Sequence, residues 1–407
     1  MTSLSQEIVL ASSPDGTITA FDASSGTALG HFTGSRSPRK GLTVIGTNLI
    51  AAAHVSPDIA SGSIHLYNWW SPTPSHHLPV SEPVGPLAAT FVGFFLFAGG
   101  ISGQIHALSL PSGDLIQTFS AHNNKPVSCL KINDDGSLLF SGGEDGTIAV
   151  FSIFKLLDIS SDKSNDVVLH RFIGHESVVT SITAGIGGSN STIISCSLDC
   201  TCKFWNLAHG APLCTITFPC TIWGVEMDSM ESEFFVAGSD GFLYSGALKG
   251  GNRNMVKQGQ KLVKWEQKHY GAVVGLAMTN GGRNLVTASE NGSVWIWDVE
   301  RKEVVRVLGG EMGSISELVV AKGFGLGDGN SEVNGRSLEF SSREVSRPVR
   351  EVMEMEKVLG VLEEDRSKAI DTLGSAIEAH EKLLGLILKE AKMGSNCDSS
   401  DEEEDDI

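Results

Sequence analysis

The 407-residue sequence predicts an all-β fold, a seven-bladed β-propeller, followed by a coiled-coil-like α-helix and an acidic tail. A repeat of 41 to 54 residues indicates the propeller, because each unit reads as strands joined by a tight turn. A change to a Gly- and Ser-rich composition at Gly323 indicates the end of the propeller, and a heptad pattern of apolar residues after Pro348 indicates the helix. We expect a propeller over 1–322, a Gly- and Ser-rich linker over 323–347, an amphipathic helix over 348–393 and a disordered acidic tail over 394–407.

Composition limits the classes of protein. An apolar content of 41% supports a sizeable core, while seven cysteines and a start without a basic, apolar leader predict a reduced intracellular protein. The net charge of −18 disfavours broad binding to nucleic acid. Seven acidic side chains lie in the last ten residues, where Ser399 and Ser400 also suit an acid-directed kinase.

The repeat is visible as a turn glycine followed by an alternating strand. The intervals between these glycines are 46, 41, 43, 95 and 51 residues, and the interval of 95 is two periods with Cys200 at the missing turn. Lone hairpins are marginally stable, so we expect four-stranded blades packed radially. The glycines are Gly16, Gly62, Gly103, Gly146, Gly241 and Gly292.

The two ends of the chain indicate how the ring closes. The first unit begins at Glu7 with its second strand, "EIVLASS", and therefore lacks an inner strand. The segment Ser314 to Lys322, "SISELVVAK", is left over after the seventh unit. We predict that it supplies the missing strand and leaves no open sheet edge there.

One stretch imitates a membrane span. Residues 83–113 contain no charged side chain, and a spanning helix needs about 20 apolar residues. Pro86, Gly93, Gly99 and Gly100 interrupt the stretch, so two buried strands are predicted instead, and no membrane contact.

Several blades resemble the WD-repeat family, whose units carry a Gly-His pair, a turn Asp and a terminal Trp-Asp. His175, Ser195, Asp199 and Trp205 match this hydrogen-bonded set best. The repeat around Gly146 matches this set only in part. It has His122, Ser141 and Asp145, but Phe151 is in the Trp position. Trp297-Asp298 is the one true Trp-Asp dipeptide.

The cysteine-rich stretch "IISCSLDCTCKFWNL" is predicted to be two strands and a turn, with Cys196 in the second strand of the fifth unit, Cys200 in the turn and Cys202 in the third strand. Its spacing matches no common zinc pattern. Cys214 and Cys220 follow nearby, which leaves a metal site as the weaker alternative to small buried side chains.

A heptad pattern marks the C-terminal segment. Apolar residues fall on a and d positions from Val352 to Ile387, with further apolar residues at e and with Arg366 and His380 as polar breaks. Self-association or docking with a partner helix is favoured, and folding back on the propeller is the alternative. The predicted self-association residues are Leu359, Leu362, Ile370, Leu373, Ile377 and Leu384.

Two excursions from the ring are candidate partner or RNA contacts. Trp69 and Trp70 extend beyond a strand end into a Pro-rich loop, although at least one is expected to pack beneath that loop. A segment with six basic residues and one acid contains Arg253, Lys257 and Lys261 and could contact phosphate, with an ordinary solvated loop as the favoured alternative.

The sequence contains no Walker loop, metalloprotease motif, nucleophile elbow or metal spacing. We therefore expect no enzyme activity, no cofactor and no metal.

A closer resemblance covers the propeller and extends into the terminal helix. The stretches "SCLKINDDGSLLFSGGEDGTIAVFSI", "SLDCTCKFWNLAHGAPLCTITFP" and "HEKLLGLILKEAKM" are similar to the WD-repeat subunits of Rix-type complexes, which act in assembly of the pre-60S ribosomal particle and include the Root Initiation Defective proteins of plants. The resemblance implies a non-catalytic scaffold of the nucleus, nucleolus and nucleoplasm. It would hold the other Rix-type subunits, assist removal of an internal transcribed spacer from pre-rRNA, lie near a midasin-type ATPase and pair two copies through the terminal helix.

The competing classes are a substrate receptor of a cullin-type ubiquitin ligase and a generic chromatin or signalling scaffold. The receptor signature is W-D-x-R, whereas this chain has Trp297-Asp298-Val299-Glu300, with Glu where Arg is required. The sequence therefore favours the ribosome-assembly scaffold.

Overall fold

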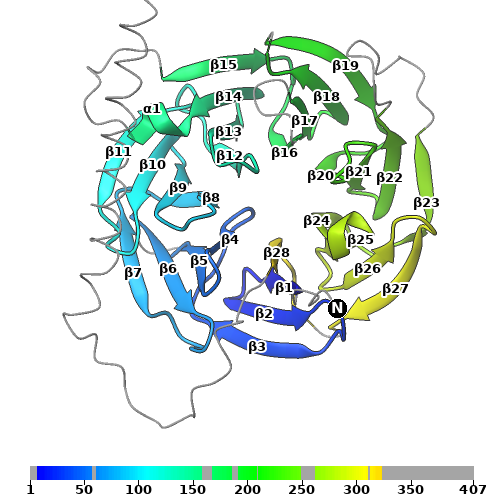
Figure 1. Cartoon of the computed structure of the whole chain (residues 1–407), viewed down its shortest axis with the longest axis horizontal. Coiled ribbons are helices and arrows are strands. Elements are labelled where there is room, and N and C mark those ends of the chain that lie inside the picture. The colour runs from blue at the N-terminus through cyan, green and yellow to red at the C-terminus, as the bar shows by residue number, and fades with distance from the viewer. Residues whose placement is uncertain are drawn as a thin grey trace, which may run out of the picture. The chain divides into compact units, whose positions relative to one another are not determined.

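A computed structural model describes residues 7–56, 61–157, 167–185, 191–208, 210–248, 262–309 and 312–322. The chain divides into two compact units, and all of these residues lie in the first, Met1–Gly329. They form seven four-stranded antiparallel sheets around a central axis (Figure 1). The predicted seven-bladed propeller is confirmed. The predicted linker, helix and tail lie outside the described residues.

The strands of each blade are lettered a to d from the axis outward. Blade 1 contains β28 (Glu317–Lys322), β1 (Glu7–Ser12), β2 (Thr17–Asp22) and β3 (Ala28–Thr33). Blade 2 contains β4 (Leu42–Ile45), β5 (Leu49–His54), β6 (Gly62–Asn68) and β7 (His76–Val80). Blade 3 contains β8 (Val84–Ala89), β9 (Phe95–Gly100), β10 (Gln104–Ser109) and β11 (Leu115–Ser120). Blade 4 contains β12 (Val127–Ile132), β13 (Leu138–Gly143), β14 (Thr147–Ser152) and β15 (Val168–Ile173).

The remaining blades follow the same order. Blade 5 contains β16 (Val179–Ala184), β17 (Thr192–Ser197), β18 (Thr201–Asn206) and β19 (Ala211–Thr217). Blade 6 contains β20 (Ile222–Met227), β21 (Glu233–Gly238), β22 (Phe242–Ala247) and β23 (Val263–Lys268). Blade 7 contains β24 (Val273–Thr279), β25 (Asn284–Ser289), β26 (Val294–Asp298) and β27 (Glu303–Leu308). The described part also has a short helix, α1 (Ile153–Leu157), and a 3₁₀ turn, η2 (Asn280–Gly282).

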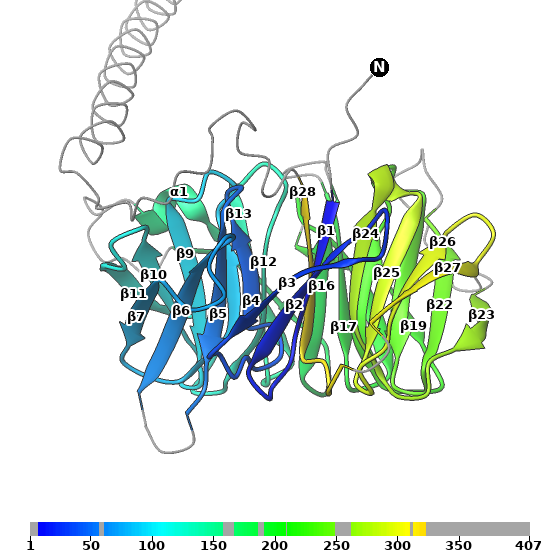
Figure 2. The ribbon, with the colours of Figure 1, turned by 90° about the horizontal axis from the view of Figure 1, so that it is seen from below.

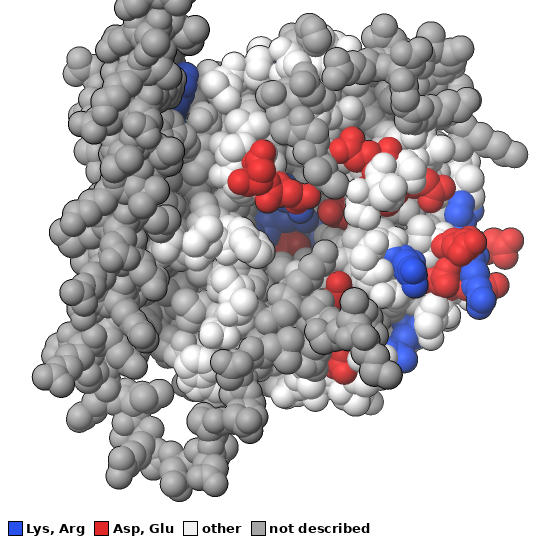
Figure 3. Space-filling view, in the orientation of Figure 1, with Lys and Arg blue, Asp and Glu red and all other residues white. Residues whose placement is uncertain are grey.

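The propeller has two faces with different loops. Because neighbouring strands are antiparallel, the a–b and c–d connections emerge on one face, the a–b face, and the b–c turns and blade-to-blade connections on the other, the b–c face. Helix α1 is a c–d connection, and it marks the a–b face at the top of Figure 2. Charged side chains on this face gather over its right half and its centre in Figure 3.

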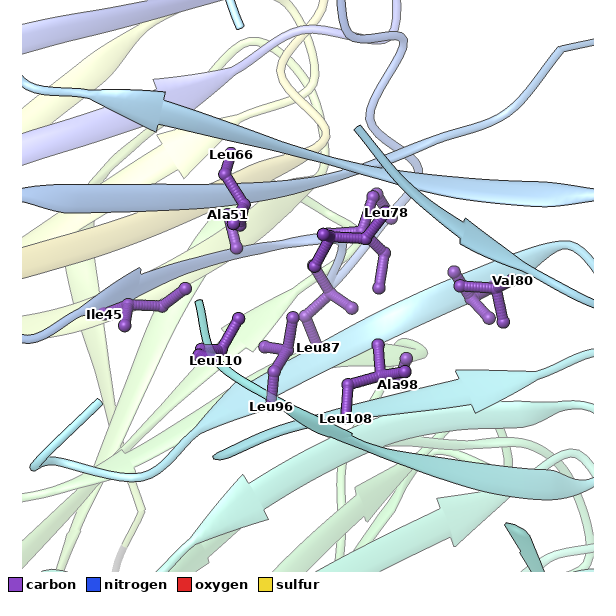
Figure 4. Packing of buried hydrophobic residues seen from close by; sticks show 13 residues of the cluster. Ile45, Ala51, Leu66, Leu78, Val80, Leu87, Leu96, Ala98, Leu108 and Leu110 are labelled. Atoms are coloured by element: carbon purple, nitrogen blue, oxygen red, sulfur yellow. The ribbon is translucent and has the colours of Figure 1, made fainter. Parts of the chain in front are cut away.

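The core lies between neighbouring blades, where the two sheet faces pack together. Figure 4 shows the layer between blades 2 and 3, in which Leu66 and Leu78 face Leu87 and Leu96. The middle residues of most b and c strands are buried, as the pattern of alternating and continuous apolar runs predicts. Such packing stabilises each blade by burying both of its faces, and it holds the loops in place.

Ring closure follows the sequence prediction. Strand β28 pairs antiparallel with β1, with Leu10 opposite Val319, and completes blade 1. The hydroxyls of Ser12 and Ser316 are 3.0 Å apart. Both ends of the propeller therefore belong to one sheet, and the prediction of a closing strand is confirmed.

The charge-free stretch over 83–113 forms strands and no membrane helix, as predicted, but it forms three buried strands, β8, β9 and β10, where two were predicted. Among the described residues, no helix has the length and apolar character needed to cross a bilayer. Pro86 lies inside β8, where the pairing with β9 shifts register between Val84 and Leu87. Gly99 and Gly100 end β9, and Gly93 shapes the β8–β9 turn with a φ of 83°.

Candidate interaction surfaces and the blade hydrogen-bond networks

Blade 5 brings together the four residues that match the WD-repeat set. The indole Nε1 of Trp205 donates to Ser195 Oγ at 2.8 Å, and Ser195 Oγ lies 2.8 Å from His175 Nε2. The other ring nitrogen, His175 Nδ1, lies 2.8 Å from Asp199 Oδ2. The carboxylate also accepts the backbone N–H of Thr201 at 2.9 Å. These hydrogen bonds join the connection that precedes strand a, strand b, the b–c turn and strand c of blade 5.

The Asp199 carboxylate at one end of this network fixes which atom donates in the hydrogen bonds of His175. The carboxylate of Asp199 accepts only, so His175 Nδ1 carries the proton and Nε2 accepts from the Ser195 hydroxyl. Burial lowers the pKa of His175, against the opposing effect of Asp199, and keeps the ring neutral. Burial alone would raise the pKa of Asp199, but hydrogen bonds from Thr201, His175 and Glu176 lower it below its usual value.

Blade 4 has the same arrangement with one member missing. His122 lies 2.8 Å from Ser141 Oγ through Nε2 and 3.0 Å from Asp145 Oδ1 through Nδ1. Phe151, which replaces the tryptophan, is buried and cannot donate to the serine. The network of blade 4 is therefore one hydrogen bond shorter than that of blade 5.

Blade 7 contains a network that sequence reasoning missed. His269 lies 2.8 Å from Thr287 Oγ1, and Trp297 Nε1 donates to the same hydroxyl at 2.8 Å. On its other side His269 contacts Ser293 Oγ at 2.8 Å. Lys268 occupies the position of the glycine in the family's Gly-His pair, so His269 could not be recognised from that motif. Burial lowers the pKa of His269 to about 4.

Blades 2 and 3 replace the network with other residues. In blade 3, Glu82 precedes the inner strand and contacts His106 Nε2 at 2.9 Å, so acid and imidazole have exchanged places. In blade 2, Ser35 lies 2.6 Å from the Tyr67 hydroxyl and 2.8 Å from His65 Nδ1. The family motif does not predict these pairs, because their residue types differ from the His, Ser, Asp and Trp of the family set.

The cysteines occupy the predicted strand and turn positions. Cys196 and Cys202 are directly opposite each other on β17 and β18, and both are fully buried. Burial raises the pKa of Cys196 well above its usual value, whereas a metal ligand must be the thiolate. Cys200 takes the turn position of the missing glycine with a φ of 64°. Within the described part of the chain, no three His, Cys, Asp or Glu side chains converge as a metal site would need.

A cavity of about 470 Å³ follows the propeller axis and is lined by the inner strands. One acid and one base of its lining are paired: Lys40 Nζ lies 3.5 Å from Glu317 Oε1, and the Lys40 backbone N–H donates to Glu317 Oε2 at 2.9 Å. Lys131, Asp134 and Glu226 also line the cavity. The Lys40–Glu317 pair ties the closing strand to blade 2. Near it, the Arg39 guanidinium lies 3.7 Å from the centroid of the Trp223 ring. These contacts give the cavity a structural role.

The candidate contact residues have different surroundings. Trp69 packs on Phe32 in the core of blades 1 and 2, with ring centroids 5.8 Å apart, whereas Trp70 is 68% exposed. Arg253, Lys257 and Lys261 lie outside the described residues, as do the six residues proposed for self-association. The neighbouring Lys264 is described, and its Nζ lies 3.5 Å from the centroid of the Phe242 ring.

Comparison with known protein families identifies repeats in three parts of the chain. The model of the WD domain, G-beta repeat family matches residues 113–152, 166–206 and 260–298. Each segment contains the d strand of one blade and the a, b and c strands of the next: β11 to β14, β15 to β18 and β23 to β26. Trp205 lies in the second segment and Trp297 in the third.

The matches to individual proteins cover more of this chain than the repeat segments do. Protein ROOT INITIATION DEFECTIVE 3 of Arabidopsis thaliana is 31% identical over 357 residues, which cover 85% of this chain and 80% of the relative. WD repeat-containing protein 18 of Homo sapiens is 29% identical over 229 residues, and the match covers 56% of this chain and 52% of that protein. Pre-rRNA-processing protein IPI3 of Yarrowia lipolytica is 27% identical over 303 residues, or 70% of this chain and 69% of the relative.

Proposed function

The chain belongs to the WD-repeat family of Protein ROOT INITIATION DEFECTIVE 3, and we propose that it is a non-catalytic scaffold subunit of a nuclear Rix-type complex in 60S ribosomal subunit maturation. The 31% identity to that relative over 85% of the chain carries the proposal, because it covers more of the chain than the three segments that match the repeat model. The similarity to the pre-rRNA-processing protein IPI3 of Yarrowia lipolytica supports pre-rRNA processing as the process in which this scaffold acts.

The site chemistry agrees with a scaffold. The buried histidines of blades 4, 5 and 7 are held in hydrogen-bond networks that join strands of one blade, so they stabilise the fold and do not face a substrate. In the axial cavity, Lys40 and Glu317 form an ion pair that joins the closing strand to blade 2. A rigid ring with several loop surfaces is suited to holding partner proteins.

The finer parts of the proposal concern partners and place. We propose that the chain binds the other Rix-type subunits, assists removal of an internal transcribed spacer, lies near a midasin-type ATPase and resides in the nucleolus and nucleoplasm. The heptad pattern around Leu373 supports a homodimer through the C-terminal segment. The basic residues near Lys257 are candidates for a local RNA contact.

The ubiquitin-ligase alternative lacks its key side chain. Asp298 accepts the backbone N–H of Arg301 at 2.9 Å and so closes the c–d turn of blade 7. Glu300 occupies the position at which the receptor signature requires Arg. The local geometry therefore gives this alternative no support.

Affinity purification from nuclear extract with mass spectrometry tests the proposed function. We expect large-subunit assembly factors to co-purify with the full chain. Depletion of the protein should cause pre-rRNA that retains an internal transcribed spacer to accumulate. Recovery of cullin ligase subunits or histones in their place, with unchanged pre-rRNA, would contradict the proposal.

A further inference from the structure

Two neighbouring blades carry the same turn on the a–b face. In blade 3 the a–b turn runs from Thr90 to Gly93, and the Gly93 N–H donates to Thr90 O at 2.9 Å. In blade 4 the a–b turn runs from Asn133 to Gly136, and the Gly136 N–H donates to Asn133 O at 3.0 Å. Both glycines have a positive φ, of 83° and 73°. The two turns therefore share one backbone geometry, which leaves the two residues at each tip free to differ.

The tip residues are apolar in blade 3 and acidic in blade 4. Phe91 and Val92 are 89% and 68% exposed, and the equivalent positions of blade 4 are the exposed Asp134 and Asp135. Turn tips are solvated and usually carry polar residues. Because the same turn forms with two aspartates, its shape does not require Phe91 and Val92. Their exposure therefore indicates a contact with another surface.

The tip of the blade 3 turn belongs to a larger apolar surface. Trp70, in the c–d connection of blade 2, is 68% exposed, and Phe154, on α1 of blade 4, is 80% exposed. Together with Phe91 and Val92, these residues form what we call the apolar patch. Its three aromatic side chains present roughly 350–600 Å² at these exposures. This area is about half or more of the roughly 800 Å² that one partner contributes to a standard interface.

Contacts between loops hold the apolar patch in place. A Cβ at Gly93 would lie 3.1 Å from Ile45 Cγ2, so the a–b turns of blades 2 and 3 touch. In blade 3 the Leu110 N–H donates to Phe94 O at 2.8 Å, which joins the c–d connection to the a–b turn. Helix α1 of blade 4 lies against β11 of blade 3. The loops of blades 2 to 4 therefore form one connected surface.

The surroundings of the apolar patch are almost free of charge. Between residues 41 and 113, Glu82 is the one Asp, Glu, Lys or Arg among the described residues, although 19% of the whole chain is charged. Ser102 and His106 bind its carboxylate, so Glu82 is not available to a partner. Figure 3 shows the white surface on the left, apart from one basic side chain at the upper left, and acidic side chains at the centre.

Acidic residues border the apolar patch at the opening of the axial cavity. Asp134 and Glu226 line the cavity near the a–b face, where Lys131 is also part of the lining. Asp135 and Asp228 lie in the a–b turns of blades 4 and 6. None of these four acids, which we call the acidic rim, forms an ion pair with another residue in the described ranges. Four acids against one base give this opening a negative potential.

The combination fits a partner that is both apolar and basic. The acidic rim repels nucleic acid and anionic membranes, and it repels the same surface of a second copy of this chain, whose net charge is −18. We infer that this face binds a basic amphipathic segment of another protein, whose apolar side chains cover the apolar patch and whose Lys or Arg side chains pair with the acidic rim. The inference goes beyond the proposed function, because it does not depend on which complex the chain enters.

Fluorescence anisotropy of the full chain with two labelled peptides tests the inference. The probe is a helical peptide of about 18 residues with Leu on one face and Lys on the other, and the matched peptide has Glu in place of Lys. We expect the Leu/Lys peptide to bind at least about tenfold more tightly, because the acidic rim attracts Lys and repels Glu. Its binding should weaken as salt rises, since exposed charge pairs are screened.

Two double variants locate the contact. Phe91→Asn with Val92→Asn replaces the apolar tip by a residue that is common in turns and adds no charge. Asp134→Asn with Glu226→Gln removes two acids of the rim. Each double variant should weaken binding of the Leu/Lys peptide about tenfold, and the second should also reduce the dependence on salt. Circular dichroism of each variant checks that the propeller is folded.

Matched controls lie on the b–c face. Ile101→Asn removes a 54% exposed apolar side chain from the b–c turn of blade 3, and Glu144→Gln with Glu176→Gln removes two exposed acids of blades 4 and 5. Neither control should change binding. The inference is overturned if the Leu/Lys peptide does not bind, if the variants on the a–b face bind it as the parent does, or if the controls lose as much. Equal binding of the Leu/Glu peptide also overturns it, because the acidic rim would then have no part in recognition.

Discussion

Replacing Ser195 by alanine tests the network of blade 5 against an internal control. Ser195 is fully buried and stands between Trp205 Nε1 and His175 Nε2, each at 2.8 Å. Ser195→Ala leaves one buried donor and one buried acceptor without a partner. Each unpaired buried group costs about 1–3 kcal/mol, so we expect the free energy of unfolding to fall by about 2–6 kcal/mol.

Ser141→Ala in blade 4 is the matched control. Ser141 is as buried as Ser195 and has the same contact with a histidine, but Phe151 has no N–H to leave unpaired. The expected cost is therefore about half, on the order of 1–3 kcal/mol. In a Trp205→Phe background, Ser195→Ala should also cost only this smaller amount, since the coupling between the two side chains has been removed.

Urea unfolding followed by circular dichroism measures both costs, and melting temperatures provide a second readout at roughly 2 °C per kcal/mol for a domain of this size. Equal losses for the two serine variants would refute the reasoning, because the indole hydrogen bond would then contribute nothing. A neutral Ser195→Ala would refute the whole network as a source of stability.

Four further predictions concern pH, backbone strain, the cysteines and assembly. The pKa of His269 is lowered to about 4, so the unfolded chain binds a proton that the folded chain excludes as pH falls from 6.5 to 4; His269 alone should lower the free energy of unfolding by about 2 kcal/mol between pH 8 and pH 5 in urea titrations, and His65, whose pKa is also lowered to about 4, adds to the loss; a flat profile would contradict this. Cys200→Gly should raise the melting temperature, since Cys200 holds a φ of 64° at a cost of about 1 kcal/mol, and a lower value would show that its side chain contributes more than the strain costs. Cys196→Ser should cost about 1–3 kcal/mol for an unpaired buried hydroxyl and release no zinc by elemental analysis, whereas stoichiometric zinc lost on mutation would contradict the strand interpretation. Leu373→Glu should abolish self-association in light scattering with the propeller still folded, and a monomeric parent at micromolar concentration would remove the basis of the proposed homodimer.

Much of the fold was predictable because its determinants are local. A turn glycine followed by an alternating strand reports on neighbouring residues only, and its recurrence gives the number of blades. The unpaired first strand and the left-over segment before Lys322 likewise predict the closing sheet, since a propeller ring has no other place for them. The residues of the blade 5 network could be named from the sequence because they follow the family spacing.

The sequence by itself therefore determined the propeller, the order of its strands and the position of Cys200 in a turn. Only the tertiary structure decided which residues replace the network in degenerate blades, such as Glu82 with His106. The physical reason is that strand and turn propensities act between neighbours in the chain, whereas these contacts depend on how whole blades pack. The Lys40–Glu317 pair spans 277 positions, and it exists only because the ring closes.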